Sequence, residues 1–267
     1  MLTRGRSANG LFAGLALALL LLAANAGAEQ VPAGPPAPVA QPVGQSAKLV
    51  TLQGIRSATV APGGLAFAAI AFSSRRASPT GYLQDADGSA VTVFGIGNAN
   101  DGFGLQVTAN ITSLQTSFAD SGHLSLKASH RVAAQIPVYV GLSIDRLAGW
   151  GDAKGILASA SLQMTWFPQA KIGQGRFPLM LTLGAGSHLR HQGRDPAVFF
   201  GAGIGLTPHF GASLAWTGET VTLGTAFRFD GLRNMTFAAN LDDVFDQNNS
   251  RRVGVSATWL IDGLFGG

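Results

Sequence analysis

Cysteine is absent from the 267-residue chain. Without a thiol the protein forms no disulfide, holds no metal through thiolates, has no cysteine nucleophile and carries no lipid on a cysteine as a lipoprotein does. These exclusions apply to every fold that the chain could adopt.

Charge is also scarce. Asp, Glu, Lys and Arg make up 12% of the residues, whereas a typical soluble domain contains ~25%. A surface that faces water is normally dense in charge, so we predict that much of this protein's surface does not face water. The net charge of +4 is spread along the chain without a basic run, which argues against nucleic-acid binding.

Long hydrophobic runs are limited to one stretch near the N-terminus. The apolar run 11–24 follows Arg4 and Arg6 and precedes Ala26-Gly27-Ala28, which are small residues of the kind that a signal peptidase reads. This run is shorter than the ~20 residues of a membrane-spanning helix. We therefore predict a cleaved secretory signal peptide over 1–28, with an uncleaved anchor as the alternative.

The next two stretches lack a regular hydrophobic period. Residues 29–47 are rich in proline and alanine, a composition typical of a disordered linker; a tether to the cell wall or to a partner protein is the alternative. Residues 48–63 contain short apolar stretches and are left open as an extra strand or a plug. We assign 64–260 to a β-domain and 261–267 to a C-terminal tail.

Strict alternation of apolar and polar residues is the main pattern of the chain. In 102–113, Phe103, Leu105 and Val107 share one face of an extended strand, while Gln106 and Thr108 share the other. Similar patterns predict about twelve strands, over 65–74, 89–97, 102–113, 123–132, 137–145, 155–167, 177–188, 198–206, 210–216, 221–229, 234–241 and 252–260. Their connectors tend to alternate between short and long.

The composition of the two faces predicts where the strands lie. The apolar face carries almost no charge, and the other face is mostly Gly, Ser, Thr, Asn and Gln, whereas a soluble barrel keeps its large apolar residues inside. The expected fold is therefore all-β, a single-chain antiparallel transmembrane β-barrel of about 12 strands. Trp166, Trp216 and Trp259 are aromatic-girdle candidates; tryptophans in a soluble core are the alternative.

The stretch 252–259, Arg-Val-Gly-Val-Ser-Ala-Thr-Trp, resembles the terminal signal by which the barrel-assembly machinery recognises its substrates. From about 64 to 260 the chain resembles porin-like bacterial outer-membrane β-barrel proteins as a class. The resemblance implies the outer membrane of a Gram-negative bacterium, contact with its lipid, and a passing interaction with the assembly machinery. It does not name a transported solute.

The leading hypothesis for function is a channel or transporter for small polar solutes. A polar lumen replaces bulk hydration in such proteins, and inward charges set the ion preference. We expect a mild preference for anions because Lys127, Arg131 and Arg228 outnumber Asp145. The predicted lumen-lining residues are Gln106, Asn110, Lys127, Arg131, Tyr139, Asp145, Gln163 and Arg228.

Two alternatives stay open. One is a barrel with a packed lumen and a structural, adhesive or anchoring role, in which lumen-facing glycine rows such as 201–205 let opposite walls fill the space. The other is a lipid-modifying enzyme on the barrel wall, with His123 and Ser125 or His209 and Ser213 as candidates. His188 and His191 form a weak metal pair without a third ligand. We predict no catalytic residues, no metal and no cofactor.

Overall fold

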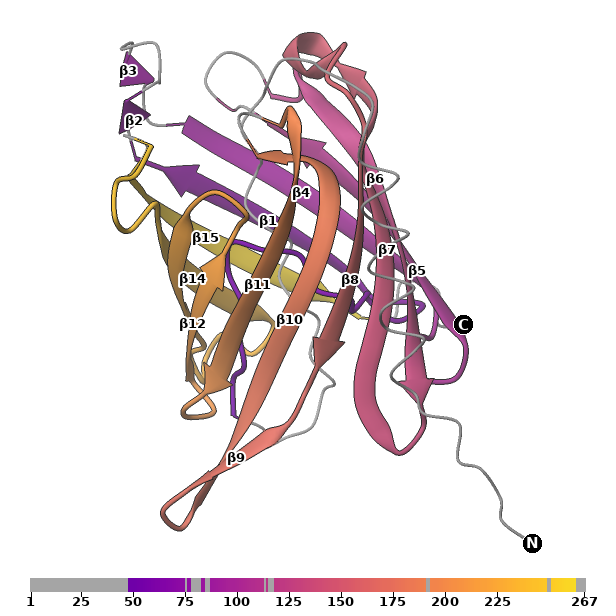
Figure 1. Ribbon diagram of the computed structural model, residues 1–267, viewed down its shortest axis with the longest axis vertical. Helices are drawn as coiled ribbons and strands as arrows, with labels where there is room; N and C mark the ends of the chain where they lie inside the picture. The colour runs from indigo at the N-terminus through magenta and orange to yellow at the C-terminus, as the bar shows by residue number, and fades with distance from the viewer. Residues whose placement is uncertain are drawn as a thin grey trace, which may run out of the picture.

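The computed structural model describes residues 48–262 apart from 75, 78–82, 85–86, 113, 115–117, 191–192 and 249–250. Among these residues, twelve antiparallel strands close into a barrel (Figure 1). The strands are β1 (Ala66–Ser73), β4 (Asp87–Gly97), β5 (Phe103–Ile111), β6 (Gly122–Ala133), β7 (Ile136–Trp150), β8 (Ser159–Trp166), β10 (Gly175–Arg190), β11 (Asp195–Gly205), β12 (Phe210–Trp216), β13 (Val221–Phe227), β14 (Met235–Asp242) and β15 (Arg252–Ile261). The predicted signal peptide and linker lie outside the described residues.

The barrel is closed by the pairing of its first and last strands. β1 pairs with β15 from Ala66 opposite Ile261 to Ser73 opposite Gly254, and every other strand of the ring pairs with its neighbours in chain order. Closure satisfies the backbone hydrogen bonds of both edge strands, which lipid cannot do. The predicted fold class and strand number are confirmed.

The remaining elements are short. β9 (Gln169–Ile172) pairs only with the beginning of β10 and extends that hairpin, which explains why the connector after β8 is long. β2 (Arg76–Ala77) pairs with β3 (Leu83–Gln84) in the first connector, and a 3-10 helix, η1 (Gly151–Ala153), follows β7. No helix among the described residues has the length and apolar character needed to cross a membrane.

The outer face of the barrel wall exposes apolar side chains, whereas the inner face buries polar ones. Phe103 is 73% exposed and Leu142 is 50% exposed on the outer face, whereas Gln163 and Thr165 on the inner face are almost completely buried. A soluble core would bury the phenylalanine and expose the glutamine. The exterior is therefore the apolar face that the alternation predicted.

Two strand boundaries differ most from the prediction. β7 continues to Trp150 although its alternation ends at Asp145, and β8 begins at Ser159 although an alternating pattern begins at Gly155. The pairing of β6 with β7 shifts register near this point. An irregularity of this kind interrupts the period of two without ending the strand.

Residues 48–64, here called the inner segment, precede β1 and form no helix or strand. Ala58 and Ala61 in this segment are fully buried, and Leu52 is nearly so. The segment contacts the inward faces of β11, β12 and β13 as well as those of β5, β7 and β8. It therefore runs through the lumen, where Figure 1 shows it in indigo between the walls.

The inner segment forms an arch whose two ends lie at the same rim. Near its start, Leu49 N donates to Thr207 O at 2.8 Å, in the connector between β11 and β12. At its far point Gly54 approaches Thr222, near the opposite rim. It then returns, and Gly63 N donates to Gly97 O at 2.6 Å before the chain enters β1.

Lumen-facing glycines make room for this arch. A Cβ at Gly203 would overlap the carbonyl oxygen of Thr51, and one at Gly211 would overlap that of Leu49. On the opposite wall, a Cβ at Gly141 would lie 2.9 Å from the Cα of Ala58. The glycine row 201–205 thus faces the lumen, where it accommodates the backbone of the inner segment.

Candidate functional site

The lumen wall satisfies the irregular backbone of the inner segment with side chains. Thr165 Oγ1 accepts a hydrogen bond from Ala58 N at 2.8 Å, and Gln106 Oε1 accepts one from Ala61 N at 3.1 Å. On the opposite wall, Ser213 Oγ accepts one from Gln53 N at 3.2 Å. A buried backbone without a ladder partner needs such bonds, so polar wall residues hold the arch in one path.

Two wall residues donate hydrogen bonds to carbonyl oxygens of the inner segment. Gln163 Nε2 donates to Ser57 O at 3.4 Å and to Ser143 Oγ at 2.7 Å. Lys127 Nζ donates to Thr59 O at 3.2 Å. Hydrogen bonds therefore run in both directions between the wall and the inner segment along most of the arch.

Apolar clusters hold both limbs of the arch, the first limb before Gly54 and the return limb after it, against the wall. The first limb packs on β10, β11 and β12, and the return limb packs on β1 and β4. Bulky inward residues such as Phe67 and Phe199 occupy positions where the alternation predicts polar ones, because the inner segment covers them. The clusters contain Val50, Leu52, Ile55, Met180, Phe199 and Ala215, and Ala61, Leu65, Phe67, Ala69, Val91 and Val93.

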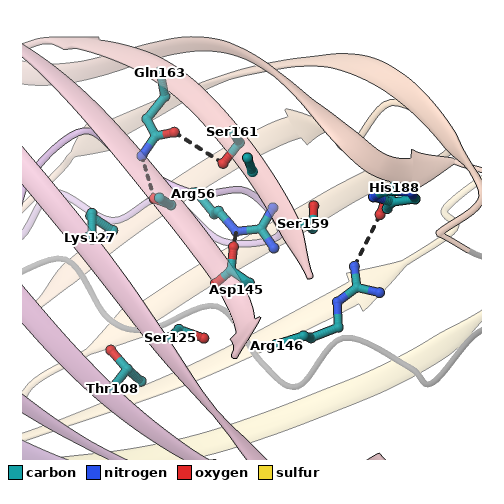
Figure 2. Close-up of polar contacts among 12 residues, drawn as sticks. Arg56, Thr108, Ser125, Lys127, Asp145, Arg146, Ser159, Ser161, Gln163 and His188 are labelled. Atoms are coloured by element: carbon teal, nitrogen blue, oxygen red, sulfur yellow. Dashed lines mark hydrogen bonds and ion pairs between the residues drawn. The ribbon is translucent and has the colours of Figure 1, made fainter. Parts of the chain in front are cut away.

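Charged side chains gather where the arch crosses from one wall to the other. Arg56 Nε lies 2.8 Å from Asp145 Oδ2, and Figure 2 shows this ion pair beside Arg146, which extends toward His188. Arg146 Nη2 donates to His188 O at 3.0 Å. The ion pair joins the inner segment to β7, and the second contact joins β7 to β10.

A β-bulge places Arg146 next to Asp145. The register of β6 against β7 shifts between Leu124 and Leu126, so that β7 carries one extra residue there. Arg146 has a φ of 61°, a left-handed conformation that is unfavourable for a residue with a side chain. Strict alternation assigns Arg146 to the outer face, which is why sequence reasoning missed it.

The predicted lumen residues fall into two groups. Gln106, Lys127, Asp145 and Gln163 contact the inner segment. The others bond elsewhere: Asn110 Nδ2 to Ser125 Oγ at 3.4 Å, Arg131 Nε to Ile136 O at 3.2 Å, Tyr139 Oη to Asn100 Oδ1 at 2.5 Å and Arg228 Nε to Thr236 Oγ1 at 3.2 Å. Desolvation lowers the pKa of the Arg228 guanidinium below its ordinary value. Arg56 was missed because its segment shows no period.

The wall formed by β14 and β15 has a different pattern. Asp242 lies 2.9 Å from Arg252 Nε across the two strands and also accepts from Asn240 Nδ2 at 2.9 Å. Thr236 and Ser256 on the same inner face are half-buried. Asp242 thus links Asn240 and Arg252 along this wall. We call the lumen face that carries these residues, Thr236 and Ser256 the β14–β15 lane.

The histidines that the sequence offered as catalytic or metal-binding candidates lie in separate places. Ser125 Oγ accepts from Asn110, and His123 Nδ1 has no hydrogen-bond partner among the described residues. His209 Nε2 lies 2.8 Å from Asp230 Oδ1 in exposed connectors. Among the described residues no three side chains gather as a metal site, and His191 lies outside the described residues.

The tryptophan candidates lie on the barrel wall. Trp166 and Trp259 are exposed and Trp216 is half-buried. Their role in an aromatic girdle stays a prediction.

Thr165 offers a test of how the wall holds the arch. Thr165→Val is expected to lower the free energy of unfolding by about 1–3 kcal/mol, because the buried Ala58 N–H loses its acceptor. The measurement is the temperature at which the folded form disappears on unboiled gels. Thr92→Val, on the exposed outer face of β4, is the matched control and should cause no loss; equal effects would contradict the role of Thr165.

No protein-family model and no curated protein matches the chain. Among solved structures, it is similar to the outer-membrane protein Omp33 of Acinetobacter baumannii, with 12% identity and a TM-score of 0.43 over 75% of this chain and 100% of that one. It is also similar to an outer-membrane channel of Pseudomonas putida F1, with 12% identity and a TM-score of 0.43 over 76% of this chain and 98% of that one. Likeness at this level carries no functional argument.

Proposed function

We propose that the chain is an outer-membrane barrel that passes small polar solutes, with the inner segment acting as a plug that narrows the route. The observation that carries this proposal is the arch itself: an irregular segment crosses the lumen and is held by wall side chains such as Gln106, Gln163 and Thr165. A barrel that only needed a filled core would not require a separate segment with its own hydrogen-bonded path.

The apolar exterior supports a membrane setting. Large side chains such as Phe103, Leu142 and Val253 are half or more exposed around the outer face. Their burial in lipid is favourable, and a charge at these positions would cost about 2–4 kcal/mol at the bilayer midplane. The outer membrane of a Gram-negative bacterium is the setting in which closed barrels of this kind occur.

The β14–β15 lane supports a route past the plug. Its polar side chains are half-buried, and Asp242 bonds to Asn240 and Arg252, whereas the polar side chains of β5 to β8 largely bond to the inner segment. Near this lane Arg228 adds a positive charge, and Arg252 is balanced by Asp242. These charges favour anions over cations, together with those of Lys127, Arg131, Arg56 and Arg146.

Fractionation followed by conductance measurement tests the proposal. The full chain is expected in the outer-membrane fraction, with a band whose mobility changes on boiling. In planar bilayers under a salt gradient, the reversal potential should indicate a mild anion preference. A soluble band without a heat shift, or strong cation selectivity, would contradict the proposal.

A packed-lumen barrel with a structural or anchoring role is the second candidate. The apolar clusters around Phe67 and Phe199 favour it, because they fasten both limbs of the arch to the wall. A heat-modifiable outer-membrane protein that never conducts, with or without its inner segment, would support this candidate and exclude the channel.

A further inference from the structure

We infer that the lumen contains a binding site for a small oxyanion, such as phosphate or a carboxylate, formed by Arg56, Lys127 and Arg146. The inference deepens the proposed function, on which it rests for the role of the ligand, by naming a solute class and the place where it binds. The site itself follows from the charges and donors gathered at the crossing of the arch.

Among the described residues, three cations share this part of the lumen with one carboxylate. Arg56 is paired with Asp145 at 2.8 Å. Lys127 lies opposite Ser143 in the β6–β7 pairing, so Asp145 is its diagonal neighbour on the inner face. Arg146 follows Asp145 in β7 and donates to His188 O at 3.0 Å, and Figure 2 shows it beside the Arg56–Asp145 pair. The group therefore carries an excess of positive charge.

That excess is costly in a mostly buried site. An ionised group removed from water needs an opposite charge as well as hydrogen-bond partners. Lys127 and Arg146 have carbonyl partners, but the carboxylate of Asp145 forms its ion pair with Arg56. An oxyanion among Arg56, Lys127 and Arg146 would offset the remaining charge. The asymmetry of the cluster thus points to an anionic ligand.

The donors needed by such a ligand are present. Each guanidinium has five N–H donors and the ammonium has three. Arg56 uses Nε for Asp145, Arg146 uses Nη2 for His188 O, and Lys127 donates to Thr59 O. Within the part of the chain that the structure describes, most of their donor capacity is left over. The planar fork of a guanidinium matches the paired oxygens of phosphate or carboxylate better than a spherical halide.

The local backbone supports a dedicated site. Arg146 is brought beside Asp145 by the β-bulge in β7, in a left-handed conformation with a φ of 61°. Bulges re-aim side chains next to functional sites, and an unfavourable conformation persists where surrounding contacts enforce it. The bond from Arg146 to His188 O on β10 is one such contact, and Figure 2 shows both arginines in the same region as Asp145.

Equilibrium dialysis with radiolabelled inorganic phosphate tests the inference. The full chain is used in a maltoside detergent, which has no phosphate of its own, at low ionic strength. We expect saturable binding that Lys127→Met and Arg146→Met each weaken by about tenfold or more, because each removes a charged donor. Lys171→Met, in the exposed hairpin strand β9, is the matched control and should bind as the original protein does.

Asp145→Asn provides a change in the opposite direction. Removing the one carboxylate frees Arg56 Nε and increases the positive charge, so phosphate should bind more tightly. Each variant is compared only after its heat-modifiable band shows that it folds. Absence of saturable phosphate binding to the unchanged protein overturns the inference whether or not a variant folds, as does equal weakening by Lys171→Met and Lys127→Met.

Binding and conduction can fail separately. Dialysis requires no membrane current, so a barrel that binds phosphate but does not conduct would retain the site and lose the channel proposal. A barrel that conducts anions without saturable phosphate binding would retain the channel and lose the site.

Discussion

Removal of residues 48–61 is expected to raise the single-channel conductance several-fold. This segment crosses the lumen, its residues Ala58 and Ala61 are fully buried, and it contacts walls on both sides. Its loss would widen the lumen while leaving the strand pairings of the barrel in place. Planar-bilayer recordings of the refolded variant measure the effect.

A deletion of equal length from the linker 29–47 is the control for this experiment. It shortens the chain before the arch and leaves residues 48–61 unchanged, so we expect its conductance to match that of the full chain. The deletion of 48–61 should also lower the unfolding temperature, because both apolar clusters lose their contribution from the segment. Unchanged conductance in a folded variant would contradict a plugging role.

Gly203→Ala is expected to displace the first limb of the arch. A Cβ at this position would overlap the carbonyl oxygen of Thr51, and backbone atoms cannot give way as a flexible side chain can. We expect a loss of about 1–3 kcal/mol in the free energy of unfolding, as for other overpacked sites. Conductance should rise as well, because the displaced limb no longer follows the wall.

The same substitution at Gly102 separates this effect from a general effect of alanine. A Cβ at Gly102 would meet nothing within 4 Å, so Gly102→Ala should leave stability and conductance unchanged or slightly increase stability through the unfolded state. If both variants behaved alike, the close approach of the inner segment to β11 would not limit substitution at Gly203.

Alternation along the chain predicted the barrel because it reports directly on which side of a strand a residue faces. The pattern in 102–113 corresponds to β5, Phe103–Ile111, with Gln106 buried inside and Phe103 exposed outside. The same rule placed Lys127, Asp145 and Gln163 on the inner face. It could not anticipate Arg146, since a bulge changes the facing of a residue without changing the local composition.

The sequence by itself determined the strands, their number and the apolar exterior, since a period of two depends only on neighbouring residues. Only the tertiary structure decided that 48–64 crosses the lumen, that Arg56 pairs with Asp145 and that Gly203 lies against Thr51. Ala58 and its acceptor Thr165 are 107 positions apart in the chain. No local pattern encodes such a pairing, because these contacts exist only once closure of the barrel has brought distant walls around the same segment.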